Sequence, residues 1–149
     1  MKNLFNTIGE VKATYKTTGK PFAQITGSKD AATLLRELWD QDTIEYYESF
    51  CVLMLNRANK VIAYRFVGQG GTSGVIADPK TIFQAALLAN SSALIVAHNH
   101  PSGQLKPSRQ DLNLTEKVKL GGDFLDIHLL DHIIITADGH YSMADNGEL

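Results

Sequence analysis

The spacing of hydrophobic and polar residues along the chain predicts three helices. Each combines a start signal with apolar residues at helical spacing. The first spans residues 28–39 and starts at Ser28, a good N-cap. The other two span residues 79–90, with Asp78 as N-cap and Pro79 at the first helical position, and residues 108–122, which start at Ser108 and end at Gly121 and Gly122.

Short apolar or alternating runs between these helices predict strands. The expected strands cover residues 8–16 (a weak edge strand), 50–55, 61–67 (the hairpin partner of the preceding strand), 92–98, 124–130, 132–136 and 141–143. Hairpins interleaved with helices predict an α+β fold, in which helices pack on a mixed, mostly antiparallel sheet.

Composition is that of a soluble globular domain, with 44% hydrophobic and 20% charged residues. We expect one domain over residues 1–149, with an N-terminal strand and helix in residues 1–40 and a core over about residues 48–143. The longest apolar runs, at 50–55 and 93–97, are far shorter than the roughly 20 residues of a membrane helix. With no secretory signal and a single cysteine, Cys51, the sequence predicts a cytoplasmic protein without disulfides.

Charge argues against nucleic acid as the partner of this domain alone. The net charge is −2, from 14 basic and 16 acidic residues. Five lysines and one glutamate lie in residues 1–29, and six acidic residues accompany Arg36 in residues 30–48. No broad basic stripe results, so we expect neither DNA binding by the isolated domain nor membrane association.

The most informative stretch runs from His98 to Asp111. His98 and His100 are two residues apart at the end of a predicted strand, so their side chains point to the same side of the sheet. Asp111 lies in the first turn of the following helix, where it can turn back toward them. Two imidazoles and a carboxylate are ligands that zinc favours, and three protein ligands leave one position for water. The alternative interpretation is two surface histidines and a helix capping box formed by Ser108 and Asp111.

This stretch resembles the JAMM motif of the JAB/MPN metalloprotease superfamily: His-x-His, seven residues, Ser, two residues, Asp. The segments at 98–103 and 129–133 look like the RadC-like branch, which is labelled as DNA-repair proteins, and the likeness extends over about residues 48–143. The resemblance implies a curved JAB/MPN-like sheet and one Zn²⁺ per chain, held by His98, His100 and Asp111. It also implies that Ser108 stabilises the tetrahedral intermediate of amide hydrolysis. Residues 1–40 are too short for the helix-hairpin-helix region that precedes this domain in full-length relatives.

Family members use an upstream glutamate as general base, and the candidates are Glu48 and Glu45. Glu48 fits the branch better, because it lies two residues before the Phe50 that opens the apolar strand. A base must also lie on a rigid element within hydrogen-bond reach. Either glutamate is otherwise a solvated charge of the acidic connector.

Three other signals carry less weight. The glycine-rich residues 68–74 lack the Gly-Lys-Ser/Thr ending of a P-loop and predict a flexible turn. Cys51 lies within an apolar run, which predicts a buried and inert thiol. Asp131 and His132 either support the zinc ligands by hydrogen bonding or form an ordinary strand-edge pair.

The leading functional hypothesis is a zinc-dependent metallopeptidase or isopeptidase that hydrolyses a peptide or isopeptide substrate by attack of zinc-activated water. One alternative is a non-catalytic JAB/MPN interaction module that binds protein partners in DNA repair or on a mobile element. Another is metal-dependent chemistry on nucleic acid, which the net acidity disfavours.

Overall fold

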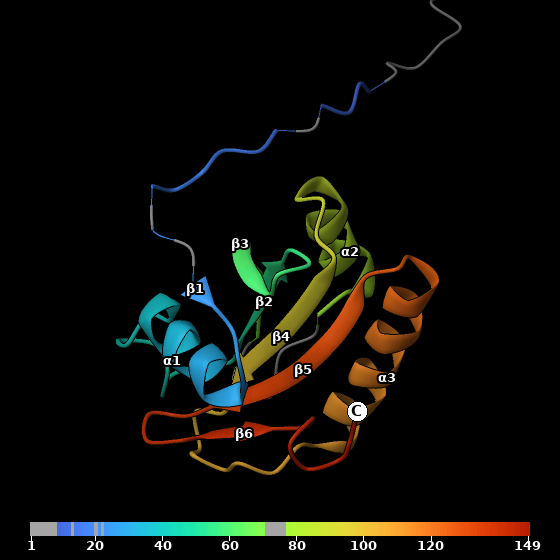
Figure 1. Cartoon of the computed structure of the whole chain (residues 1–149). Coiled ribbons are helices and arrows are strands. Elements are labelled where there is room, and N and C mark those ends of the chain that lie inside the picture. Colours follow the sequence, from blue (N-terminus) through green and yellow to red (C-terminus); the bar gives the residue numbers. More distant parts are fainter. Residues whose placement is uncertain (1–8, 13, 20, 22, 71–76) are drawn as a thin grey trace, which may run out of the picture.

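A computed structural model describes residues 9–12, 14–19, 21, 23–70 and 77–149 (Figure 1). Secondary structure within these residues begins shortly before the first predicted helix and continues almost to the C-terminus. In chain order the elements are β1 (Ala23–Gln24), α1 (Ser28–Leu38), β2 (Ser49–Leu55), β3 (Lys60–Gln69), α2 (Pro79–Leu88), β4 (Ala93–Asn99), α3 (Arg109–Phe124), β5 (His128–Ile135) and β6 (His140–Ser142).

The strands of the described residues form one six-stranded sheet in the order β1-β3-β2-β4-β5-β6. β4 and β5 are parallel and are connected through α3, while the other neighbouring strands are antiparallel. A parallel pair requires such a crossover because its two strands start at the same end of the sheet. The predicted α+β fold with a mixed, mostly antiparallel sheet is confirmed, and the sheet is visibly curved in Figure 1.

Helices cover both faces of this sheet. α1 packs on one face, over alternate residues of β2 and β4 such as Leu53 and Ile95. α2 and α3 pack on the opposite face, over the intervening residues such as Val52 and Val96. The central strands are therefore buried on both sides, which explains why β2 and β4 are continuous apolar runs in the sequence.

The helix starts follow the sequence signals closely. α2 begins as predicted, with Asp78 accepting a hydrogen bond from the Lys80 amide at 2.9 Å. α1 begins one residue earlier than predicted, because Gly27 is its N-cap and Ser28 is already helical. The Ser28 hydroxyl instead donates to the Asp145 carboxylate near the C-terminus.

The prediction that Gly121 and Gly122 end the third helix is wrong, because α3 continues through both to Phe124. Their role is close packing at the point where the chain returns toward β5. A Cβ atom on Gly122 would lie 2.2 Å from the carbonyl oxygen of Ile127. The two strands predicted on either side of Asp131 are also one strand, β5.

The weak edge strand predicted over residues 8–16 is also wrong where it can be compared, because residues 9–12 and 14–16 form no strand. Residues 8 and 13 lie outside the described residues. The strand that pairs with β3 at this edge is instead β1, through Ala23 opposite Val61 and Gln24 opposite Lys60.

Cys51 lies in the middle of the sheet and is completely buried. Burial raises the pKa of its thiol to about 12, because the thiolate would have to be desolvated. The prediction of a buried thiol is confirmed, and both its burial and its raised pKa argue against a nucleophilic role. Separately, none of the helices in the described residues is long and apolar enough to cross a bilayer.

We predict that Gly122→Ala destabilises the fold by about 2–3 kcal/mol, because its Cβ collides with backbone rather than with a movable side chain. Gly121→Ala is the matched control. Its Cβ would approach only the ring of Phe83, at 2.8 Å, and alanine gains up to about 1 kcal/mol of helix propensity over glycine. Urea unfolding measures both. Equal stability of the two variants would contradict the packing role of Gly122.

Candidate metal centre

The end of β4 presents two imidazoles on the same side of the sheet, as predicted. His98 is the penultimate residue of the strand, and its side chain is only 1% exposed. The His100 amide still donates to the Ile135 carbonyl at 3.0 Å, so the backbone remains held against β5 one residue past the end of the strand. The backbone that carries both rings is therefore paired with β5.

The start of α3 supplies the carboxylate. Ser108 is the N-cap, and its hydroxyl accepts a hydrogen bond from the Asp111 amide at 3.1 Å. The Asp111 carboxylate returns the bond by accepting from the Ser108 amide at 2.7 Å through Oδ2. The capping box that the sequence suggested as an alternative to a metal site is thus present. It does not exclude that site, since the same carboxylate also faces the two histidines.

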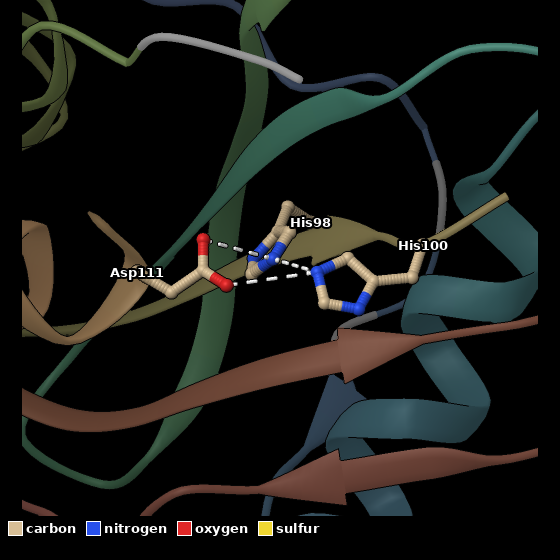
Figure 2. Close-up of side chains that lie close together, drawn as sticks. All are labelled: His98, His100 and Asp111. Atoms are coloured by element: carbon tan, nitrogen blue, oxygen red, sulfur yellow. Dashed lines mark hydrogen bonds and ion pairs between the residues drawn. The ribbon is translucent and has the colours of Figure 1, made fainter. Parts of the chain in front are cut away.

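His98, His100 and Asp111 converge on one small region (Figure 2). The two Nε2 atoms are 2.9 Å apart, Asp111 Oδ1 lies 3.3 Å from His98 Nε2, and Asp111 Oδ2 lies 3.6 Å from His100 Nε2. Ligands of a tetrahedral zinc ion at about 2.0–2.2 Å are themselves roughly 3.3–3.6 Å apart. The two distances to Asp111 lie in this range, whereas the two Nε2 atoms are at a hydrogen-bond distance and must separate by about 0.4 Å to bind the ion. The donor set therefore fits a zinc ion in chemistry, and in spacing after this small adjustment.

A hydrogen bond at Nδ1 of His100 determines the protonation of its other ring nitrogen, Nε2, which faces the other two candidate ligands. His100 Nδ1 lies 2.6 Å from the Gln104 carbonyl oxygen, which can only accept a hydrogen bond. Nδ1 must therefore carry a proton, and in the neutral ring Nε2 is left with a free lone pair. This backbone contact is typical of metal-binding histidines, because it sets both the tautomer and the ring orientation.

The local electrostatics favour a cation. The hydrogen bond with Asp111 raises the pKa of His100 despite partial burial, and the negative charges of Asp111 and Glu48 act in the same direction. Burial alone would raise the pKa of the Asp111 carboxyl. Contacts with His100 and His98 outweigh burial, so that pKa lies well below its usual range. The carboxylate is therefore ionised, and its field favours positive charge beside the imidazoles.

Glu48 is the residue immediately before β2, and β2 is the neighbour of β4 in the sheet. Phe50 and His98 form the last pair between β2 and β4, and extending this antiparallel register by two residues past the pair would bring Glu48 opposite His100. Directly opposed residues share a face of the sheet, and the charge of Glu48 contributes to the raised pKa of His100. Glu45, in contrast, is exposed in the preceding turn.

Asn99 holds the segment that carries Glu48 against the strand that carries the histidines. Its buried side chain accepts from the Ser49 amide at 2.7 Å and donates to the carbonyls of Ile44 at 2.7 Å and Tyr47 at 2.9 Å. Sequence reasoning missed this role. The available signal was a polar residue in a buried strand, whose partners only the tertiary structure identifies.

The side chains of Asp131 and His132, which the sequence analysis considered together, have different partners in the structure. Asp131 turns away from the candidate metal centre, accepting from the Ser142 hydroxyl at 2.6 Å and the Ala144 amide at 3.0 Å. His132 lies behind His98, with His132 Nε2 2.8 Å from His98 Nδ1. Burial and the neighbouring His98 lower the pKa of His132 well below its usual value, so this ring is neutral. Of the two residues, only His132 therefore contacts a candidate ligand.

We predict that the chain binds one zinc ion and that Asp111→Asn weakens binding more than about 100-fold, because it removes the anionic ligand. The asparagine oxygen can still accept from the Ser108 amide, so α3 remains capped. Zinc at about 100 times its Kd should stabilise the wild type by roughly 2.7 kcal/mol. Chelator competition and thermal unfolding measure both effects, with Asp123→Asn on the exposed surface of α3 as control. Equal zinc affinity in all three proteins would contradict the site.

Comparison with known proteins identifies the family. The model of the family described as the RadC-like JAB domain matches residues 25–148. A UPF0758 protein of Flavobacterium johnsoniae is 42% identical over 124 residues, which make up 83% of this chain and 53% of the relative. A UPF0758 protein of Methanosarcina mazei is 38% identical over 129 residues, covering 86% of this chain and 55% of the relative.

A third relative, a UPF0758 protein of Porphyromonas gingivalis, is 44% identical over 103 residues, which cover 68% of this chain and 45% of the relative. The chain thus spans about half the length of the curated relatives that it matches. The matched region includes the whole candidate metal centre. On this evidence, the chain belongs to the RadC-like JAB domain family.

Proposed function

We propose that this protein is a zinc-dependent hydrolase of amide bonds, of the metallopeptidase or isopeptidase type. The observation that carries the proposal is the convergence of two imidazoles and one carboxylate, with separations of 2.9, 3.3 and 3.6 Å between their ligand atoms. Three protein ligands are the number found in catalytic zinc sites. The position of Glu48 beside the same centre gives the proposal its second support.

The chemistry follows from what each group offers. When bound, zinc supplies a Lewis acid for the scissile carbonyl and lowers the pKa of a coordinated water to about 7. Glu48 accepts the proton released by the attacking water and delivers it to the leaving amine. A carboxylate whose charge acts on His100 is suited to this role, because it is near the centre without being one of the three ligands.

Ser108 is proposed to donate a hydrogen bond to the developing oxyanion. Its oxygen accepts from the Asp111 amide within the capping box, and this bond does not use the hydroxyl hydrogen. The cap fixes the position of the oxygen while the hydrogen rotates toward an acceptor. A donor held in place before reaction stabilises charge in the transition state without reorganisation.

The accessibility of these groups is consistent with a polypeptide substrate. His98 is buried, but His100, Asp111 and Glu48 are partly exposed and Ser108 is exposed. The reactive side of the centre thus faces solvent, while its supporting side faces the core. An open site of this kind admits a peptide or isopeptide chain.

We predict that Glu48→Gln lowers the rate of amide hydrolysis by about 10²–10⁴-fold without changing the zinc content, because it removes a proton acceptor but no ligand. Peptide and isopeptide-linked libraries, assayed with zinc-loaded protein, identify the substrate and measure the effect. Glu45→Gln is the matched control and should retain wild-type activity. Full activity of Glu48→Gln in the cell would instead favour a non-catalytic interaction module.

Ser108→Gly should lower the rate by about 10²–10³-fold, the usual cost of removing one oxyanion donor. Glycine is the informative replacement, because it caps helices nearly as well as serine, whereas alanine would also cost about 1 kcal/mol of helix stability. Steady-state kinetics with zinc analysis tests this prediction. Unchanged kcat with bound zinc would refute the role of the hydroxyl.

A further inference from the structure

A continuous chain of side-chain contacts runs beneath the candidate metal centre and connects two of its ligands. His98 Nδ1 lies 2.8 Å from His132 Nε2, and His132 Nδ1 lies 2.6 Å from Thr115 Oγ1. Thr115 Oγ1 in turn lies 2.6 Å from the backbone carbonyl oxygen of Asp111. The chain thus begins at one proposed ligand and ends at the backbone of another.

Three separate elements contribute to this chain. His98 belongs to β4, His132 to β5 and Thr115 to α3. The parallel register places His132 opposite Val96, so it shares a face of the sheet with His98. Phe50 stacks on the His98 ring at 6.2 Å and contacts the His132 ring edge-on at 5.6 Å.

Because the three side chains of this chain are buried, a hydrogen bond with its donor and acceptor mismatched would be costly. His98, His132 and Thr115 are 1%, 0% and 3% exposed, so bulk solvent cannot replace a lost partner. Two acceptors or two donors facing each other here would leave buried polar groups unpaired. Such a group costs about 1–3 kcal/mol, which is enough to select a single arrangement of protons.

The carbonyl of Asp111 determines that arrangement, because it can only accept. Thr115 must donate to it, so the Thr115 oxygen is left to accept from His132 Nδ1–H. A neutral His132 then has an unprotonated Nε2, which accepts from His98 Nδ1–H. In neutral His98 this leaves the lone pair on Nε2, the atom that faces His100 and Asp111.

The opposite arrangement would satisfy the contact between the two ligand rings, because His98 Nε2–H could donate to His100 Nε2 at 2.9 Å, but it fails at the other end of the chain. In the preferred arrangement the two Nε2 lone pairs instead face each other where the cation would bind. If His98 carried its proton on Nε2, His132 would have to donate through Nε2 and accept through Nδ1. Thr115 would then donate to His132, and two oxygens without a hydrogen between them would face each other at 2.6 Å. Met143 Sδ is the other neighbour of the hydroxyl, at 3.4 Å, but a thioether is a weak acceptor.

From this geometry we propose that His132 and Thr115 are positioning residues of the metal centre. They hold His98 with its proton on Nδ1 and its Nε2 lone pair directed at the ion, and they couple that ligand to the first turn of α3. The inference rests on the proposed zinc site. It assigns to buried β5 and α3 residues a role in metal affinity that the three ligands do not account for.

The first test reads the tautomer directly and needs no metal. Long-range ¹H–¹⁵N correlation spectra of the metal-free protein, recorded at a mildly alkaline pH, report which ring nitrogen carries the proton. Nδ1–H is expected for both His98 and His132. A proton on Nε2 of His98 would overturn the proposal. This result stands whether or not the chain proves to be a hydrolase.

The second test measures the Kd for zinc by chelator competition. Thr115→Val and His132→Phe remove the hydrogen bonds but keep approximate shape, and each should weaken zinc binding by about 10–100-fold. Thr115→Ser and His132→Gln retain an acceptor and a donor and should recover most of that loss. Thr33→Val is the control, since Thr33 makes the same type of bond to Lys29 O in α1, away from the metal centre.

These variants separate positioning from structural support. A purely structural role would lower the melting temperature of the metal-free protein but leave the zinc Kd of the folded variant unchanged. A Kd within about twofold of wild type in folded Thr115→Val would therefore overturn the proposal. If His132→Phe fails to fold, Thr115→Val and the tautomer measurement still decide the question.

Discussion

The double role of the Asp111 carboxylate is the constraint on which the centre depends. Oδ2 caps α3 by accepting from the Ser108 amide, and both carboxylate oxygens face the histidines that follow from β4. α3 is also the crossover between the parallel strands β4 and β5, so the turn that carries Asp111 belongs to the connection between these two strands. The candidate ligands are thus positioned by the same contacts that set the topology.

Residues on both faces of β4 help to position the metal centre. His98 lies on the face covered by α2 and α3, where His132 and Thr115 support it from below. Asn99 points to the other face and binds the backbone of the segment that carries Glu48. Buried polar side chains of this kind are tolerated because every one has a partner among the described residues. Reactive groups on the outside and fixed partners on the inside together give a rigid site open to solvent.

Local sequence signals predicted much of the fold, because capping and alternation act over a few residues. The start of α2 at Pro79 and the buried strand at 50–55 needed only such signals. Gly121 and Gly122 led to a wrong helix end, because glycine marks close packing as well as helix ends. Only the approach of the Ile127 backbone to Gly122 distinguishes the two roles. The spacing from His98 to Asp111 predicted the convergence of the candidate ligands. The positions of Asn99 and His132 relative to their partners depend on strand register, which no local pattern specifies.

X-ray absorption spectroscopy of the zinc-loaded protein tests the central claim most directly, because it reports the ligands of the bound ion itself. Our account predicts a four-coordinate ion with two imidazole nitrogens and oxygen ligands, at about 2.0–2.2 Å. A spectrum with fewer than two imidazoles, or with a six-coordinate shell of oxygens alone, would contradict the proposed metal centre and the hydrolase function that depends on it.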